Sequence, residues 1–225
     1  MFNAGTASAY FNFPDYDILG LIGNGLIDLN KYMDVYVLLG PSAGTAVNAA
    51  AVQCLEGMAK VAEVVGDEDS ANEWVSIAAS VKIAINDLLW NDTLGNYAVG
   101  VSTPDVYGVS AIAFALSSGV ANKTRIKLCV DSMEGLRQGP GYDTSDTDNT
   151  TKISPNTNGF LLDALLQTGH TDEAAFLLDN LWDAMISNES YRSGASWEYV
   201  SQSLEPGFGE FTSLSHPWVV HLPTH

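Results

Sequence analysis

Apolar residues at helical spacing occur in pairs of segments that are joined by very short turns. Residues 45–65 carry apolar side chains at helical spacing and stop at Gly66, and a second apolar stripe runs over residues 71–89. Asp67 or Asp69 can cap this second helix. Because the turn between the two helices is so short, they must pack in opposite directions. The pattern predicts an antiparallel helical hairpin.

The same arrangement recurs twice further along the chain. The spacing predicts helices over residues 105–117, ending before Gly119, and over residues 123–136. A third hairpin is expected from residues 158–167 and from residues 172–185, the second of these helices being capped by Asp172. The chain is therefore expected to be all-α.

Long loops separate these hairpins. Residues 138–149 are rich in Gly, Asp, Ser and Thr, and residues 191–206 combine Ser and Gly with aromatic side chains. A last short helix is expected near Ser213, and the only strand signals are over residues 32–39 and 96–101. Helical hairpins separated by long loops indicate an α-hairpin toroid or solenoid, in which loops at one end form the active site.

Composition excludes several classes of partner. A chain of 225 residues with 46% hydrophobic content can bury a core, so residues 1–225 are interpreted as a single domain. The formal charge of -18 repels a phosphate backbone, which argues against nucleic acid and anionic membrane as partners. The apolar stretch over residues 18–39 is interrupted by charged and polar residues, so no membrane span is expected.

Signals for location point in two directions. Residues 1–6 lack the basic and apolar regions of a secretory signal, so either the protein is intracellular or this chain begins downstream of its natural start. The N-x-S/T sequences, some of which are expected by chance, favour secretion as a glycoprotein; they begin at Asn91, Asn122, Asn149 and Asn188.

Metal and cofactor sites are not expected. Cys54 and Cys129 lie in apolar helical patterns, which favours two buried thiols over a disulfide. Asp143, Asp146 and Asp148 invite a calcium interpretation, but their loop lacks the glycine and distal glutamate of a calcium-binding loop. A solvated acidic loop is the preferred interpretation, and no cofactor is expected.

Several segments carry a family resemblance in their order and spacing. They are the helical hairpin 48–66 and 84–91 followed by Gly95-Asn96-Tyr97, then Ile153-Ser154-Pro155 before Gly159-Phe160, Leu181-Trp182-Asp183-Ala184-Met185, Gly194-Ala195-Ser196-Trp197-Glu198, and Ser213-Leu214-Ser215-His216-Pro217-Trp218. Together they resemble the catalytic domain of glycoside hydrolase family 78 α-L-rhamnosidases and their six-hairpin relatives.

The resemblance implies the carboxyl-terminal part of an (α/α)6 toroid. It extends over about residues 13–218 and corresponds to the later half of such a domain, so the toroid is expected to be incomplete. In the family the general acid lies in a loop upstream of the matched region, and no corresponding motif precedes Phe13.

Glu198 is the candidate catalytic residue. Inverting hydrolysis needs an ionised carboxylate that activates water, and the resemblance gives this role to the glutamate of the Trp-Glu pair. Trp197 could raise the pKa of the carboxylate as an apolar wall, or pack against a sugar face. The alternative is a core tryptophan beside a solvated glutamate.

Candidate sugar-binding residues lie near both ends of the chain. His216 and Trp218 match a motif in which an imidazole bonds a hydroxyl, and an indole beside it could stack on the sugar ring. A helix-start histidine with a core tryptophan is the alternative. Asp15, Tyr16 and Asp17 occupy the place of a family loop that lines the sugar subsite, with tyrosine where tryptophan is usual.

The leading hypothesis is an inverting glycoside hydrolase acting on terminal α-L-rhamnosyl residues. A six-hairpin polysaccharide lyase on rhamnosyl-uronate linkages is one alternative, against which the scarcity of Arg and Lys near Glu198 argues. A non-catalytic carbohydrate-binding or helical fragment is the other. An incomplete toroid exposes apolar helix faces, so self-association is expected.

Overall fold

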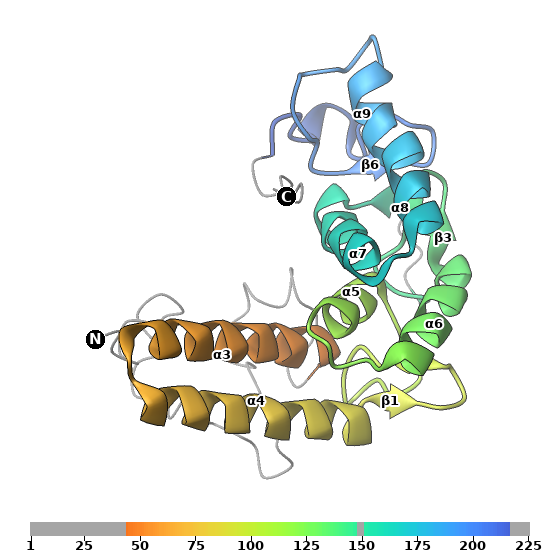
Figure 1. The fold of residues 1–225 in the computed structure, drawn as a ribbon. Helices are drawn as coiled ribbons and strands as arrows, with labels where there is room; N and C mark the ends of the chain where they lie inside the picture. The colour runs from red at the N-terminus through yellow and green to blue at the C-terminus, as the bar shows by residue number, and fades with distance from the viewer. Residues whose placement is uncertain (1–43, 148–150, 217–225) are drawn as a thin grey trace.

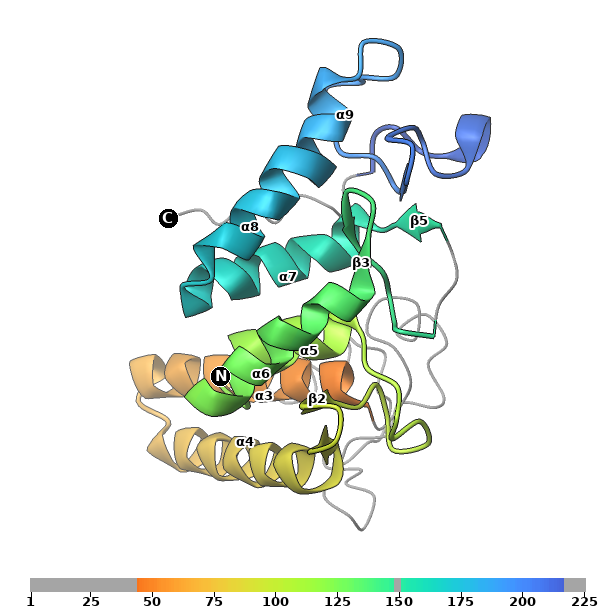
Figure 2. The same ribbon diagram turned by 90° about the vertical axis from the view of Figure 1, so that its right-hand side faces the viewer.

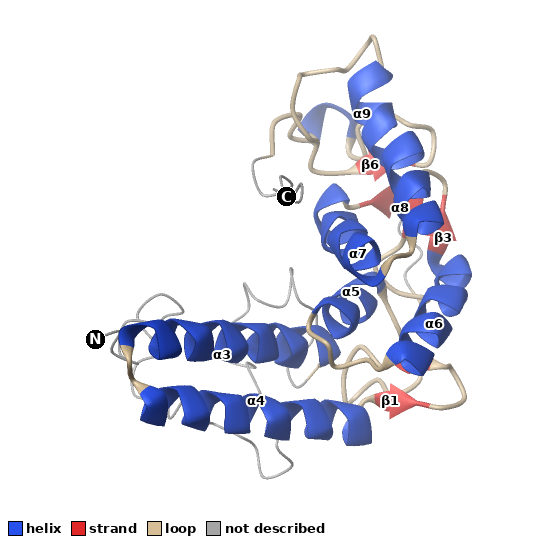
Figure 3. Ribbon diagram, in the orientation of Figure 1, coloured by secondary structure: helices blue, strands red, loops and turns tan. Residues whose placement is uncertain are grey.

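A computed structural model describes residues 44–147 and 151–216. Its helices are α3 (Thr45–Val65), α4 (Glu68–Leu88), α5 (Val109–Ser117), α6 (Lys123–Ser132), α7 (Pro155–Thr168), α8 (Thr171–Leu177) and α9 (Asp183–Ser187). A π-helical turn, Leu178–Trp182, joins α8 to α9, and 3-10 turns lie at Met133–Leu136 and Gly209–Phe211. The expected all-α class is confirmed, because strands occupy only short loop segments (Figure 3).

The strands are two-residue segments that pair in antiparallel hairpins or across loops. They are β1 (Trp90–Asn91) with β2 (Asn96–Tyr97), β3 (Arg137–Gln138) with β4 (Gly141–Tyr142), and β5 (Lys152–Ile153) with β6 (Val200–Ser201). The last pair joins positions far apart in the sequence. It ties the segment before α7 to the loop that contains Glu198.

Consecutive helical hairpins form a curved double row (Figures 1 and 2). Helices α3, α5 and α7 lie along the inner side, where α3 packs against α5 and α5 against α7. Helices α4, α6 and α8 lie along the outer side. This arrangement is the one expected of part of an α-hairpin toroid.

The core runs along the interface between the two rows. Helix α5 is the most enclosed element, since it is apolar on nearly every side and lies between α3 and α7. Ile112 is 0% exposed, and small alanines on both neighbours allow close approach. Burying each large side chain of this kind contributes about 1.5–3 kcal/mol. Apolar contact, rather than strand pairing, therefore holds the row together.

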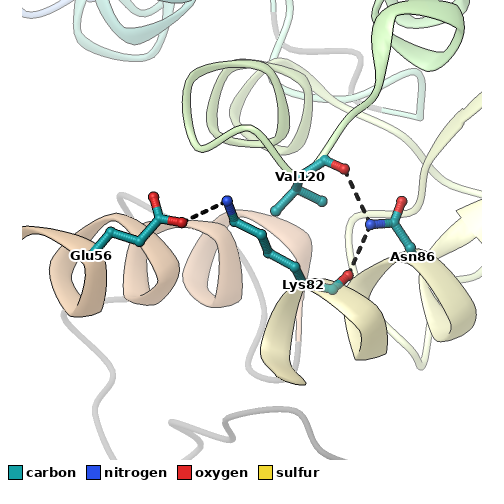
Figure 4. Close-up of polar contacts among 4 residues, drawn as sticks. All are labelled: Glu56, Lys82, Asn86 and Val120. Carbon is teal, nitrogen blue, oxygen red and sulfur yellow. Dashed lines mark hydrogen bonds and ion pairs between the residues drawn. The ribbon is translucent and has the colours of Figure 1, made fainter. Parts of the chain in front are cut away.

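Polar contacts fasten the outer helix α4 to its neighbours (Figure 4). The Lys82 ammonium lies 2.7 Å from a Glu56 carboxylate oxygen on α3. One turn later, the Asn86 amide donates to the carbonyl of Lys82 and to that of Val120, the latter at 3.1 Å. The ion pair is partly exposed and contributes about 1 kcal/mol or less. These contacts fix the hairpin against the α5–α6 connection.

The first hairpin follows its prediction, whereas the second differs at its start. Helix α3 has the predicted bounds, and Gly66 closes it with φ of 79°. Asp67 caps α4 by accepting from Ser70 N. Helix α5 begins at Val109 instead of residue 105, because the preceding backbone bonds elsewhere: Tyr107 N donates to Asp146 Oδ1 at 3.2 Å.

The third hairpin also departs from the prediction. Helix α7 begins at Pro155 rather than residue 158, because Ser154 caps it by accepting from Thr157 N. His170, not Asp172, occupies the position before α8. The predicted helix near Ser213 is wrong, since only the 3-10 turn at 209–211 forms there and Ser213 pairs with another loop segment.

The cysteine prediction holds for one of the two thiols. Cys129 is buried and free, while Cys54 is free but exposed. The apolar pattern of α3 is wider than the face that its neighbours cover, so Cys54 falls outside the buried stripe. Of the described helices, none is long and apolar enough to cross a membrane.

Candidate functional site

The loop over residues 188–216 presents the candidate carboxylate, and two anchors hold it. Val200 pairs with Ile153 in the β5–β6 contact, and both side chains are fully buried. The Trp197 N–H donates to the sulfur of Met185 on α9 at 3.1 Å. Glu198, one of the two residues between Trp197 and Val200, is only half-buried. The loop thus holds Glu198 between buried neighbours while leaving its side chain accessible.

Glu198 pairs directly with the segment that contains His216. Glu198 N donates to the Ser213 carbonyl at 2.9 Å, and Ser213 N donates back to Glu198 Oε2 at 3.3 Å. His216 N donates to the carbonyl of Ser196 at 2.9 Å. Two predicted site residues, distant in sequence, therefore lie on adjoining backbone segments. The Ser213 contact fixes one carboxylate oxygen and leaves Oε1 to accept from water or a ligand.

The Trp197 side chain lies in the protein core, whereas the Trp-Glu motif had suggested a position beside the sugar. Its side chain is 0% exposed and packs edge-on against Tyr191, with ring centroids 6.3 Å apart. In this conformation the indole offers no face to a sugar, so the side chain serves the core beneath the loop. Its buried Nε1 has no hydrogen-bond partner among residues 44–147 and 151–216. The Trp197 side chain therefore lies in the core beneath the loop, as in the alternative of a core tryptophan beside an accessible glutamate.

Asn158 is a supporting residue that the sequence did not reveal. Its fully buried amide accepts from Tyr142 N at 2.9 Å, and it donates to the carbonyls of Tyr142 and Ser154 at 2.9 and 3.0 Å. It thereby joins β4 to the first turn of α7, beside β5. The sequence feature that could have identified this residue is an asparagine on an otherwise apolar helix face, because a buried polar group needs hydrogen-bond partners.

Aromatic residues surround the outer part of the loop. Tyr199 packs edge-on against Phe208, with ring centroids 5.0 Å apart. Lys152 Nζ lies 4.8 Å from the centroid of the Phe208 ring. Gly207 N donates to the Tyr199 carbonyl at 2.9 Å, and a Cβ on Gly207 would lie 2.6 Å from Tyr199 Cβ. From the sequence, only a loop rich in aromatic residues could be predicted here, and not these contacts.

The acidic loop has a structural role in the described residues. Asp143 is 3% exposed and accepts from Thr144 N at 2.9 Å, and Asp146 binds the backbone before α5. Asp148 lies outside the described residues. Within the described ranges, no cluster of three or more His, Cys, Asp or Glu side chains could hold a metal ion.

Other predicted sugar contacts lie outside the described residues. These are Asp15, Tyr16, Asp17 and Trp218. His216 is described and half-buried, and its backbone is fixed by Ser196 as given above. The structure thus brings Glu198 and His216 to one loop cluster.

Comparison with solved structures identifies the fold. A rhamnosidase from Klebsiella oxytoca with rhamnose bound matches with a TM-score of 0.68 and 19% identity, covering 88% of this chain and 37% of that one. A GH78 family rhamnosidase of Bacillus sp. GL1 gives 0.65 and 20%, covering 88% and 21%. A GH63 mannosylglycerate hydrolase from Thermus thermophilus in complex with glucose gives 0.56 and 16%, covering 71% and 42%.

Comparisons at the level of sequence give no match, either to a family model or to a curated protein. The chain spans well under half the length of each of these solved structures. The described part of this chain has a GH78-like fold, that of part of a helical glycoside hydrolase.

Proposed function

We propose that this chain provides the water-activating side of an inverting glycoside hydrolase that acts on terminal α-L-rhamnosyl residues, with Glu198 as general base. The observation that carries the proposal is the reciprocal pairing of Glu198 with Ser213, which places a half-buried carboxylate beside the His216 segment. The GH78-like fold supports the choice of reaction and sugar.

The proposed reaction uses the two carboxylate oxygens differently. Ser213 N holds Oε2, while Oε1 takes a proton from water as the water oxygen bonds to the anomeric carbon. The bond from that carbon to the leaving oxygen breaks, and the leaving oxygen receives a proton from a second, protonated carboxyl group. His216, Trp218, Asp15, Tyr16 and Asp17 are the proposed sugar contacts.

The stereochemistry of the first product tests the mechanism. During hydrolysis of p-nitrophenyl α-L-rhamnoside, proton NMR should show β-L-rhamnose before the α-anomer appears by mutarotation. The α-anomer as first product would contradict inversion. The corresponding α-D-mannoside is the control for sugar specificity, and equal hydrolysis of both would contradict the assignment to rhamnose.

A carbohydrate-binding chain without turnover is the second candidate. It is favoured by the contacts of Glu198, whose hydrogen bonds among the described residues go to Ser213 and to no second carboxyl group. Titration calorimetry with L-rhamnose separates the candidates, since stoichiometric heat without p-nitrophenol release would identify a binding-only chain. Both candidates have carbohydrate as the partner.

We also infer that the protein is extracellular and glycosylated at Asn122. Asn122 is exposed and uses its Oδ1 to cap α6, accepting from Arg125 N at 3.0 Å. Asn91 and Asn188 instead donate through Nδ2 to the carbonyls of Pro104 and Leu204. A glycan on Asn122 Nδ2 would preserve the cap. Peptide mass spectrometry after expression through a eukaryotic secretory pathway tests this, and an unoccupied Asn122 would contradict it.

Self-association through exposed apolar helix faces is also part of the proposal. Val61, Val64 and Val65 are 46%, 86% and 62% exposed near the end of α3. Exposed apolar clusters favour contact with another surface. Sedimentation velocity should show a concentration-dependent rise in mass, whereas a monomer at all concentrations would contradict it.

A further inference from the structure

We propose that Phe211, Phe208 and Lys152 form a subsite for the leaving group of the glycoside, and that this subsite takes a flat ring. This inference rests on the proposed function, because it places the ring on the far side of the bond that Glu198 helps to hydrolyse. Its starting point is Phe211, an aromatic side chain that is 84% exposed within an ordered turn.

Backbone hydrogen bonds hold the turn that presents Phe211. Phe211 N donates to the Phe208 carbonyl at 3.2 Å, and Thr212 N donates to the Gly209 carbonyl at 3.1 Å. The Thr212 hydroxyl, on a residue only 6% exposed, accepts from Phe208 N at 2.6 Å. The exposure of Phe211 is therefore built into the turn and does not come from a loose chain end.

The turn is connected directly to the candidate carboxylate. Phe211 lies two residues before Ser213, whose backbone N–H binds Glu198 Oε2. On the other side of the loop, Gly207 N binds the carbonyl of Tyr199, the residue after Glu198. Both ends of the aromatic turn are thus fixed to residues at or next to Glu198. A ring bound to this turn would therefore be close to the segment that carries Glu198.

Phe208 and Lys152 extend the surface. Phe208 is 47% exposed and rests on the edge of Tyr199. Lys152 Nζ lies 4.8 Å from the Phe208 ring centroid, and it forms none of the ion pairs found among the described residues. The ammonium can donate hydrogen bonds to ring hydroxyls or a carboxylate while the phenyl rings cover an apolar face.

The chemistry of this surface suits a ring-shaped leaving group. Aromatic side chains gain from stacking on flat or apolar ring faces, and an adjacent cation adds hydrogen-bond donors for a polar rim. An aryl group and a second sugar ring share this chemistry. Free L-rhamnose lacks such a leaving group, so its binding should not depend on the subsite.

The experiment measures binding without turnover, in the Glu198→Gln background, by titration calorimetry. The ligands are p-nitrophenyl α-L-rhamnoside, an α-L-rhamnosyl-glucose disaccharide and free L-rhamnose. Phe211→Ala should raise the Kd of at least one of the two glycosides about fivefold and leave the Kd of L-rhamnose unchanged. An effect on the nitrophenyl glycoside alone identifies an aryl leaving group, and one on the disaccharide alone identifies a sugar.

Val75→Ala is the matched control, since Val75 is 50% exposed on α4, a helix that lies at the opposite end of the molecule from β6 and this loop (Figure 1). Unchanged binding of both glycosides to Phe211→Ala would overturn the subsite and leave the proposed function standing, provided L-rhamnose binds. An equal loss for L-rhamnose would also overturn it. If no ligand binds the parent protein, the proposed function fails and the subsite fails with it.

Discussion

Glu198 and Ser213 are joined by two hydrogen bonds, one from each backbone N–H. Glu198 N donates to the Ser213 carbonyl at 2.9 Å, and Ser213 N donates to the Glu198 carboxylate at 3.3 Å. The first bond aligns two backbone segments, and the second sets the direction of the side chain. Glu198 is therefore both a candidate catalytic group and a structural acceptor.

Substitutions at Glu198 should separate these two roles. Glu198→Gln retains a carbonyl oxygen that can accept from Ser213 N, so its melting temperature should match that of the wild type. Glu198→Ala removes the acceptor and should lower the free energy of unfolding by about 1 kcal/mol. Thermal melts by circular dichroism measure both variants. Equal stability of the alanine and glutamine variants would show that the contact contributes nothing.

Asn158 should be important for stability although it lies away from the reacting bond. Asn158→Ala removes the amide that binds Tyr142 N and the Tyr142 carbonyl, at a cost of about 2–4 kcal/mol, while the Ser154 carbonyl still accepts from residue 158 N and the Thr157 hydroxyl. Urea unfolding measures this cost. Asn156→Ala, in the same turn and only partly buried, is the control and should change stability by about 0.5 kcal/mol or less. Similar losses in both variants would contradict the assigned role.

Gly207 and Gly57 should respond in opposite directions to alanine. At Gly207 the new Cβ would lie 2.6 Å from Tyr199 Cβ and 3.2 Å from its carbonyl carbon, so the loop must shift, at a cost of about 1–3 kcal/mol. Gly57 lies within α3, and apart from the backbone of α3 itself no described residue has an atom within 4 Å of the new Cβ. Gly57→Ala should stabilise the protein by about 0.5–1 kcal/mol. A Gly207→Ala protein as stable as wild type would show that the contact relaxes freely.

Stability should fall in alkaline solution. Burial raises the pKa of the Cys129 thiol from 9.0 to about 12 and that of the Tyr97 phenol from 10.0 to about 12. Above about pH 9 the unfolded chain releases these protons while the folded chain keeps them. The stability that they contribute is thus complete below pH 9 and is lost progressively toward pH 12.

Urea unfolding between about pH 8 and pH 11 measures this loss. Cys129→Ala should reduce this loss, because the raised pKa of the Cys129 thiol then no longer contributes to it. A free energy of unfolding that stays constant across this range would contradict the burial of both groups in the folded state.

The helices could be predicted from the sequence to the extent that local patterns specify them. Helix α3 has its predicted bounds because its apolar periodicity is long and Gly66 ends it in the left-handed conformation. The start of α5 could not be found, because Tyr107 N bonds to Asp146, a residue far along the chain. Strands β3 and β4 are two residues long and carry no periodicity.

In the candidate site, too, local sequence predicted some features, whereas contacts between distant residues determine the others. The family resemblance pointed to Glu198, and local sequence could suggest a loop around it. The contacts that organise the loop, from Ser213 to Glu198 and from Val200 to Ile153, join distant positions and left no local pattern. Burial also decided the role of Trp197, since the Trp-Glu pair alone does not say which side chain faces solvent.

Release of p-nitrophenol from p-nitrophenyl α-L-rhamnoside measures whether Glu198 acts as the base of a rhamnosidase. Wild-type protein at mildly acidic pH should show turnover, and Glu198→Gln should reduce kcat about a thousandfold with its fold intact. Glu189→Gln, an exposed position in the same loop, is the matched control and should behave as wild type. Equal turnover by Glu198→Gln and wild type, or no turnover by the wild type, would contradict the assignment of Glu198 as the base of a rhamnosidase.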